Sequence, residues 1–254
     1  MKISLSLRRL AKSLMWTFFK YSDTRFTLQS GISVPVGDRN EMATFREIFI
    51  KRDYDPFLDL LSLPSTVLDL GCNSGYFAIL MIDRAYRLDS ANDLPKFVLV
   101  DANETAVKRA QEVISGCGMD PDISYVTGLV GSREESAATF FIAPASAESS
   151  AHKRIKRSRE VKVKCLDMSE LMDNYFSNGV DLIKCDIEGG EELLIRNWAE
   201  PLARARALLI EWHGFSGTWE AFIIELDKLG FSLASEHPTG RFKNALFIRR
   251  YPNL

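Results

Sequence analysis

Residues 66–77, TVLDLGCNSGYF, decide the predicted fold. The run TVLDL is short, apolar and rich in residues that favour strands, so it predicts a buried strand. A turn containing Gly71, Asn73 and Gly75 follows, and the residues after it predict a helix. Open α/β sheets use this strand, turn and helix to bring a ligand to the end of a strand, because glycines let the backbone approach closely. The stretch therefore predicts an α/β fold with a nucleotide-like ligand beyond this strand.

The rest of the chain alternates strand-like and helix-like segments. Helical spacing is clearest after Asn103, a predicted cap, and recurs at 187–204 and 218–229. This alternation is typical of a doubly wound, mostly parallel sheet. The last two predicted strands are joined by about nine residues, too few for a crossover helix, so we expect them to pair antiparallel. Apolar, β-rich runs predict the further strands of this sheet: KFVLVD (96–101), ISYVTG (123–128), VDLIKCD (180–186), RALLIEWH (206–213), FSLAS (231–235) and ALFIRR (245–250).

One insertion interrupts the alternation at about residues 138–165. The runs ATFFIA (138–143) and VKVKC (161–165) predict a β-hairpin with a long polar tip. Two interpretations of a basic cluster in this tip stay open: it contacts an anionic substrate, or it is a solvated loop, which is the commoner role of a charge run. The cluster consists of Lys153, Arg154, Lys156, Arg157 and Arg159.

The composition predicts one main domain and says little about partners. With 254 residues, of which 46% are hydrophobic, the chain can bury one substantial core. A formal net charge of -2 makes neither a nucleic acid nor an anionic membrane the obvious partner. The four cysteines form no CxxC pair and have no histidine at metal-ligand spacing, so we expect a cytoplasmic protein without a zinc site or a disulfide framework.

Residues 1–57 predict a helical extension in front of a domain at 58–254. Residues 2–20 place leucines at helical spacing but include Arg8 and Arg9, which break a signal-peptide core and leave the segment short of a membrane span. This helix either lies on a membrane surface or packs on the domain or on a partner subunit.

Residues 34–57 show helical spacing of their own. They form either a lid over the ligand or a helix that only packs on the core. The lid would turn Arg46, Glu47 and Tyr54 toward the ligand.

The predicted strand at 96–101 ends in a second candidate ligand-binding residue. Asp101 places a carboxylate where both hydroxyls of a ribose can be bound. The turn after the first strand has the pattern GxNxG rather than GxGxxG, so the glycine that seats a pyrophosphate on the helix N-terminus is missing. S-adenosylmethionine has a ribose and no phosphate and fits this turn, with Asp69 and Gly71 at its amino acid end. A nicotinamide-dependent oxidoreductase is the alternative that the missing glycine argues against.

Five motifs follow one another along the chain: VLDLGCNSGYF (67–77), FVLVDANETAVKRAQE (97–112), VKVKCLDMSEL (161–171), DLIKCDIEGGEELLIRN (181–197) and LLIEWH (208–213). In this order they resemble the FkbM-type methyltransferases, a family within the class I S-adenosylmethionine-dependent fold. The resemblance spans residues 40–250. Cys72 stands where the family commonly has a small residue, and Asp101 stands where it often has Glu. Both differences keep the chemistry of the site. The resemblance implies a seven-stranded sheet with an antiparallel last strand, S-adenosylmethionine as cofactor, and O-methylation of a hydroxyl on a sugar or natural product.

We expect the cofactor to lie at the carboxyl ends of the first strands. Together with the resemblance, the strand ends predict these cofactor-binding residues: Asp69, Gly71, Asn73, Gly75, Tyr76, Asp101, Ala102, Asn103, Gly128 and Asp186.

The predicted catalytic residues follow the fourth and fifth strands of the sheet. Methyl transfer to a hydroxyl requires collinear positioning in a dry pocket and removal of the hydroxyl proton. Asp186 and Glu188 follow one strand, and Glu211 and His213 end the next, so we expect these groups to meet. We predict Asp186, Glu188 and His213 to be catalytic, with the neutral imidazole of His213, pKa about 6.5, as the base.

The other two carboxylates of this region have a structural explanation. Glu191 and Glu192 fall in the first turn of the predicted helix, where negative side chains favour the helix dipole.

Several alternatives stay open at this stage. A divalent metal ion bridging Asp186 with Glu211 or His213 is chemically reasonable, although the sequence does not indicate one. The expected acceptor is a hydroxyl of a small molecule or glycan. RNA ribose methylation through the basic tip at 153–159 is a minor alternative, and a catalytically inactive module that only binds the cofactor is another. A peripheral membrane contact through residues 2–20 is also left open.

Overall fold

The computed structural model describes residues 24–250 except 143–158 and positions 91, 132, 134, 216, 240 and 241. The predicted helix at 2–20 and most of the basic tip therefore lie outside the described residues. Among the residues described, no helix has the length and apolar character needed to cross a membrane.

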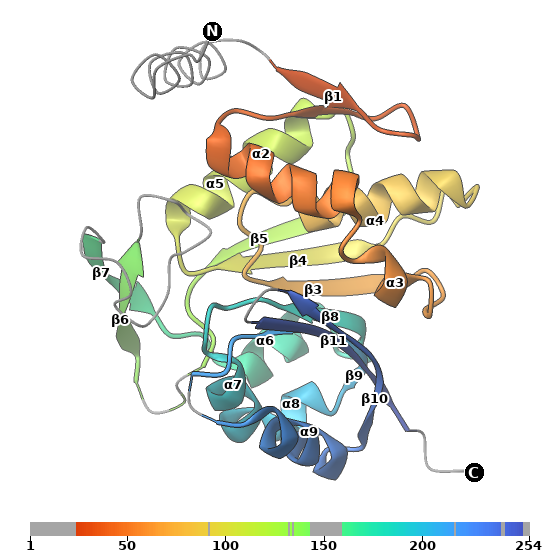
Figure 1. Cartoon of the computed structure of the whole chain (residues 1–254). Coiled ribbons are helices and arrows are strands. Elements are labelled where there is room, and N and C mark those ends of the chain that lie inside the picture. Colours follow the sequence, from red (N-terminus) through yellow and green to blue (C-terminus); the bar gives the residue numbers. More distant parts are fainter. Residues whose placement is uncertain are drawn as a thin grey trace, which may run out of the picture.

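The centre of the protein is a seven-stranded sheet in the order β10-β11-β9-β8-β3-β4-β5 (Figure 1). Five strands are parallel, and β11 runs antiparallel to both of its neighbours. The predicted doubly wound α/β sheet with an antiparallel last strand is thereby confirmed. The strands are β3 (Thr66–Leu70), β4 (Lys96–Asp101), β5 (Ile123–Thr127), β8 (Val180–Cys185), β9 (Ala205–Trp212), β10 (Phe231–Thr239) and β11 (Phe242–Arg249).

Helices cover both faces of the sheet, which is why β3, β4 and β8 are apolar throughout rather than alternating (Figure 1). Each face has its own apolar core, one beneath the helices at the start of the chain and one beneath those at its end. On the first face lie α4 (Tyr76–Arg87) and α5 (Glu104–Gly116), and on the second lie α6 (Met168–Tyr175), α7 (Glu191–Asn197), α8 (Ala199–Leu202) and α9 (Trp219–Lys228).

The segment before the sheet contains a β-hairpin that the sequence analysis did not predict. Its return strand is tied to α4 by the Tyr76 hydroxyl, which donates to the Pro35 carbonyl at 2.9 Å. The helix that follows is tied to α5 by the ion pair between Glu41 and Arg109, at 2.6 Å. This segment comprises β1 (Arg25–Thr27), β2 (Ser33–Pro35), α2 (Arg39–Phe45), the π-helix η1 (Arg46–Lys51) and α3 (Asp55–Leu58).

Two further expectations need correction. The single helix predicted at 187–204 is two short helices, α7 and α8, which meet at Trp198. Pro201 explains the break, because proline has no amide hydrogen to bond the Asn197 carbonyl in a continuous helix. The sequence analysis also missed α6, which begins after Asp167, a cap whose carboxylate accepts the amide hydrogens of Ser169 and Glu170.

The inserted hairpin is confirmed, with β6 (Ala137–Ile142) antiparallel to β7 (Arg159–Lys164). It lies beside the sheet, on the side of β5 (Figure 1). The chain leaving β5 is tied to the end of this hairpin, since the Leu129 amide donates to the Lys164 carbonyl at 2.9 Å. Phe140 of β6 lines the cavity described below. The insertion therefore contributes one side chain to the wall of the site.

Candidate active site

The turn after β3 is built so that two loops can touch. Gly71 has a φ of 80°, and a Cβ at this position would lie 1.8 Å from the Asp186 carbonyl oxygen. Only glycine satisfies both conditions. The Gly71 amide donates to the Val100 carbonyl at 2.9 Å, and the Asp186 amide donates to the Leu70 carbonyl at 3.0 Å. The ends of β3, β4 and β8 are thus held together at one edge of the sheet.

Asp101 is fixed at the end of β4 by backbone amides. Its carboxylate accepts from the amide of Asn73 at 3.0 Å and from the amide of Asn103 at 2.8 Å. Burial raises the pKa of Asp101 to about 6, and these two hydrogen bonds offset part of the rise. Asp101 therefore joins the glycine turn to the start of α5 while facing the cavity.

Behind the cavity lies a buried ion pair between neighbouring strands. Lys184 of β8 lies 3.1 Å from the Asp69 carboxylate and donates to the Gly71 carbonyl at 2.8 Å. Burial lowers the pKa of the Lys184 ammonium, but the charges of Asp69 and Asp186 outweigh it and hold that pKa well above its usual range. The pair fixes the turn from beneath, so Asp69 supports the site rather than facing the cavity.

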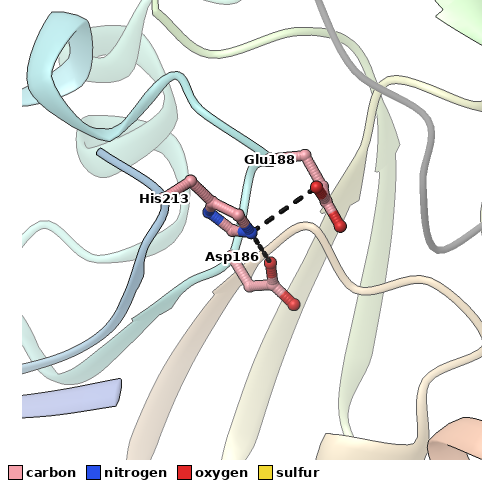
Figure 2. Close-up of side chains that lie close together, drawn as sticks. All are labelled: Asp186, Glu188 and His213. Carbon is pink, nitrogen blue, oxygen red and sulfur yellow. Dashed lines mark ion pairs between the residues drawn. The ribbon is translucent and has the colours of Figure 1, made fainter. Parts of the chain in front are cut away.

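The loop after β8 and the end of β9 bring an acidic cluster together (Figure 2). The Nε2 atom of His213 lies 3.5 Å from a Glu188 carboxylate oxygen and 3.9 Å from an Asp186 carboxylate oxygen. Glu211, two residues before His213, faces the same cavity. Burial and the Asp186 charge raise the pKa of Glu211 to about 8. The predicted meeting of these two strand ends is therefore seen in the structure.

His213 differs from the neutral base that the sequence suggested. Its Nδ1 is hydrogen-bonded to the fully buried Glu191 carboxylate at 2.9 Å, and Asp186 and Glu188 lie on its other side. Burial alone lowers the pKa of His213, but the Glu191 hydrogen bond and the three negative charges raise it to about 9. The imidazole is therefore protonated at neutral pH in this state, because carboxylates surround it more closely than the linear sequence suggested.

Glu191 and Glu192 are also more than helix-initiating residues. Glu191 accepts the Gly189 amide at 2.9 Å as well as facing His213. Glu192 accepts the indole N–H of Trp212 at 2.8 Å. Both side chains therefore tie α7 to the end of β9 and hold the acidic loop in place.

A cavity of about 240 Å³ connects the Asp101 side of the site to the acidic cluster. Its walls combine the strand ends with the N-terminal segment, which contributes Glu47 and Tyr54 but not Arg46. Of the predicted site residues, Asp69, Gly75, Asn103 and His213 do not line this cavity. Those that line it are Gly71, Asn73, Tyr76, Asp101, Ala102, Gly128, Asp186 and Glu188.

The four predicted residues outside the cavity have identifiable structural contacts. Gly75 starts α4, where a Cβ would lie 3.1 Å from Ala110, so the residue allows α4 and α5 to pack closely. Asn103 caps α5 by accepting the Thr105 amide. Asp69 pairs with Lys184, and His213 lies just beneath the cavity surface.

The sequence analysis missed the contacts by which Lys184 and Glu191 support this site. A lysine within the apolar run VDLIKC was a usable signal, since a buried charge requires a partner. Asp69 holds the matching register position on β3. For Glu191 the sequence carried no such signal, because its contact with His213 joins two separate elements.

The fold and the cavity define a class I S-adenosylmethionine-dependent methyltransferase. A model of the methyltransferase FkbM domain matches residues 69–233, and the chain belongs to this family. The family and the cofactor class expected from the sequence are thereby confirmed. No curated protein sequence matches the chain.

Two solved structures share the fold over most of the chain. The METTL16 methyltransferase domain has a TM-score of 0.50 at 12% identity, covering 99% of this chain and 83% of its own. Magnesium protoporphyrin IX methyltransferase from Synechocystis PCC 6803, with bound S-adenosylhomocysteine, has a TM-score of 0.50 at 12% identity, covering 94% of this chain and all of its own. At these identities the likeness concerns the fold alone.

Proposed function

We propose that the protein transfers a methyl group from S-adenosylmethionine to a hydroxyl of a sugar, a glycan or a natural-product small molecule. The observation that carries this proposal is the acidic end of the cavity, where Asp186, Glu188 and Glu211 face the space beside the glycine turn. Carboxylates accept hydrogen bonds from hydroxyl groups and can take up a proton. A polyol is therefore the acceptor best matched to this end.

The opposite end of the cavity fits the cofactor. Asp101, fixed by two backbone amides, suits the ribose hydroxyls, and the backbone of Gly71 can approach the amino acid end. Leu129 and Val130 offer apolar contact to an uncharged purine. When bound, the cofactor supplies an electrophilic methyl group on a sulfonium. The acidic end then lies next to the place where the acceptor must enter.

Asp186 is the residue we assign to proton removal. It lines the cavity with a side chain that is 28% exposed, whereas the His213 side chain is 1% exposed and already protonated at neutral pH. As the acceptor oxygen bonds to the methyl carbon, the carbon–sulfur bond breaks with its electron pair on sulfur, and the hydroxyl proton passes to Asp186. His213 and Lys184 hold this carboxylate in place, at 3.9 and 3.8 Å.

The acidic end also bears on the alternative acceptors. RNA ribose methylation would bring phosphates close to the Asp186 and Glu188 carboxylates, and like charges repel in a partly buried site. The basic tip proposed for RNA contact lies mostly outside the described residues. A neutral polyol meets no such repulsion, and we therefore favour it.

Calorimetry with S-adenosylhomocysteine, followed by transfer of a deuterated methyl group to a panel of sugars and polyketides, tests the proposal. We expect binding at one site and mass-labelled product from at least one hydroxyl acceptor. Folded protein that does not bind the cofactor would refute the proposal. Binding without transfer to any acceptor would point instead to an inactive binding module.

A further inference from the structure

Three ligand-type side chains converge beneath the acceptor end of the cavity. Asp186 and Glu188 come from the loop after β8, and His213 follows β9 (Figure 2). One ligand atom from each lies within 4.8 Å of the other two. Metal–ligand bonds of about 2.0–2.3 Å place ligand atoms roughly 3–4.5 Å apart around one ion. The spacing of these three groups therefore suits one cation with little adjustment.

The His213 ring is held as metal-ligating histidines usually are. Its Nδ1 bonds to the buried Glu191 carboxylate at 2.9 Å, which fixes the ring and aims Nε2 at Asp186 and Glu188. Histidines that bind metals commonly have such a carboxylate behind them, which orients the ring and increases its basicity. Glu191 is completely buried, and within the described part of the chain His213 is the cationic side chain that pairs with it. The ring is therefore oriented before any ligand binds, and an ion that binds Nε2 displaces the proton from that nitrogen.

One polar atom that faces this point makes no hydrogen bond to the described residues, and a second has long contacts to carboxylates. The His213 side chain is 99% buried, with 1% exposed, yet its Nε2 approaches carboxylate oxygens only at 3.5 and 3.9 Å. The Asp186 Oδ1 atom is buried and has no hydrogen-bond partner. A buried polar atom without a partner is costly, and a bound ion satisfies Asp186 Oδ1. This observation is independent of the clustering of acidic residues.

We propose that Asp186, Glu188 and His213 bind a divalent cation of the Mg²⁺ or Mn²⁺ type, which holds the acceptor hydroxyl. The inference rests on the proposed methyltransferase function and specifies its acceptor subsite. Two carboxylates and one imidazole favour a hard or borderline ion over a thiol-seeking one. Three protein ligands leave further coordination positions for the acceptor.

Such an ion explains how a hydroxyl is activated beside so many negative charges. A bound divalent cation lowers the pKa of an attached oxygen and adds positive charge where the oxygen anion develops. The proton still leaves the hydroxyl for Asp186, the carboxylate assigned to proton removal above. An acceptor with two neighbouring hydroxyls, as in a sugar, gains most because both oxygens can reach one ion.

Titration of the full-length protein with Mn²⁺, followed by electron paramagnetic resonance, tests the site without requiring turnover. We expect one bound Mn²⁺ per chain. Asp186→Asn and Glu188→Gln should each weaken binding by at least tenfold, and Glu191→Gln by roughly 10–100-fold through the histidine. The matched control is Asp227→Asn, at an exposed carboxylate on α9. An unchanged affinity in both Asp186→Asn and Glu188→Gln, or no Mn²⁺ binding at all, would overturn the proposal.

A second measurement identifies the imidazole. Pulsed resonance spectra of the Mn²⁺ form should show a coupled nitrogen that disappears in His213→Ala. The control is His237→Ala, at an exposed position on β10. A nitrogen signal that survives in His213→Ala, in protein shown to be folded by circular dichroism, would contradict the assignment.

Calorimetry with S-adenosylhomocysteine on the same samples distinguishes failure of the metal site from failure of the proposed methyltransferase function. Cofactor binding in protein that takes no Mn²⁺ leaves the proposed function standing and removes the metal site. Mn²⁺ binding without cofactor binding removes the proposed function and, with it, the acceptor role of the ion.

Discussion

The two ends of the cavity are built in opposite ways. At the cofactor end, Asp101 has both carboxylate oxygens bonded to backbone amides, so the group is fixed before any ligand arrives. At the acceptor end, Asp186 has an oxygen without a partner, and it faces Glu188 and His213 instead of backbone. The difference indicates that the cofactor end is rigid and preformed. The acceptor end is completed by what binds there.

The largest effect is expected from removing the charge at the acceptor end. Asp186→Asn should lower the rate of methyl transfer by about 10²–10⁴-fold, because it removes a proton acceptor from the reacting oxygen. Affinity for S-adenosylhomocysteine should change by less than about threefold, because the rigid cofactor end binds this molecule mostly without the Asp186 carboxylate. Single-turnover kinetics and calorimetry measure the two quantities. A parallel loss of cofactor affinity would show that the two ends of the cavity are energetically coupled.

A substitution at the contact between the ends tests their close approach. Gly71→Ala places a Cβ 1.8 Å from the Asp186 carbonyl oxygen at a φ of 80°, so we expect the free energy of unfolding to fall by about 2–4 kcal/mol. Gly118→Ala is the matched control, because its φ is 72° and no atom lies within 4 Å of the added Cβ. That variant should lose only about 1 kcal/mol, the cost of the backbone conformation. Urea unfolding followed by fluorescence measures both, and equal losses would rule out the contact.

The cofactor end should respond to removal of its own charge. Asp101→Asn should weaken S-adenosylhomocysteine binding by roughly 10–100-fold, as charge-assisted hydrogen bonds contribute about 1.5–3 kcal/mol. The rate at saturating cofactor should stay within about threefold of the wild type. A large loss of rate at saturation, as in Asp186→Asn, would erase the contrast between the two ends.

The smallest effect is a pH dependence of cofactor affinity. The pKa of Asp101 is raised to about 6, and only the ionised carboxylate accepts two ribose hydroxyls. Below this pH the free protein holds a proton that must leave on binding, so affinity should fall by about tenfold per pH unit and level off above it. Calorimetry with S-adenosylhomocysteine between pH 5 and pH 8 measures the slope. The same slope in Asp101→Asn would assign the titration to another group.

Much of the fold could be predicted from local patterns. Strands such as β3, β4 and β8 are buried on both faces, so each appears in the sequence as a continuous apolar run. The short β1–β2 hairpin was missed because its three-residue strands carry too few residues to show a period. The division of 187–204 into two helices was missed because the helical spacing of apolar residues continues across the break at Trp198 and Pro201.

The sequence by itself determined which strand ends carry reactive groups. The glycines, the strand-ending Asp101 and the carboxylates after β8 can each be recognised from their neighbours in the sequence. The tertiary structure alone decided how those groups act on one another. Burial pairs Asp69 with Lys184, and the contact between α7 and β9 places Glu191 behind His213. Burial and charge act through space over a few ångströms, and residues that are distant in the sequence supply them. The charge of the imidazole, and with it the character of the acceptor end, is therefore a property of the fold.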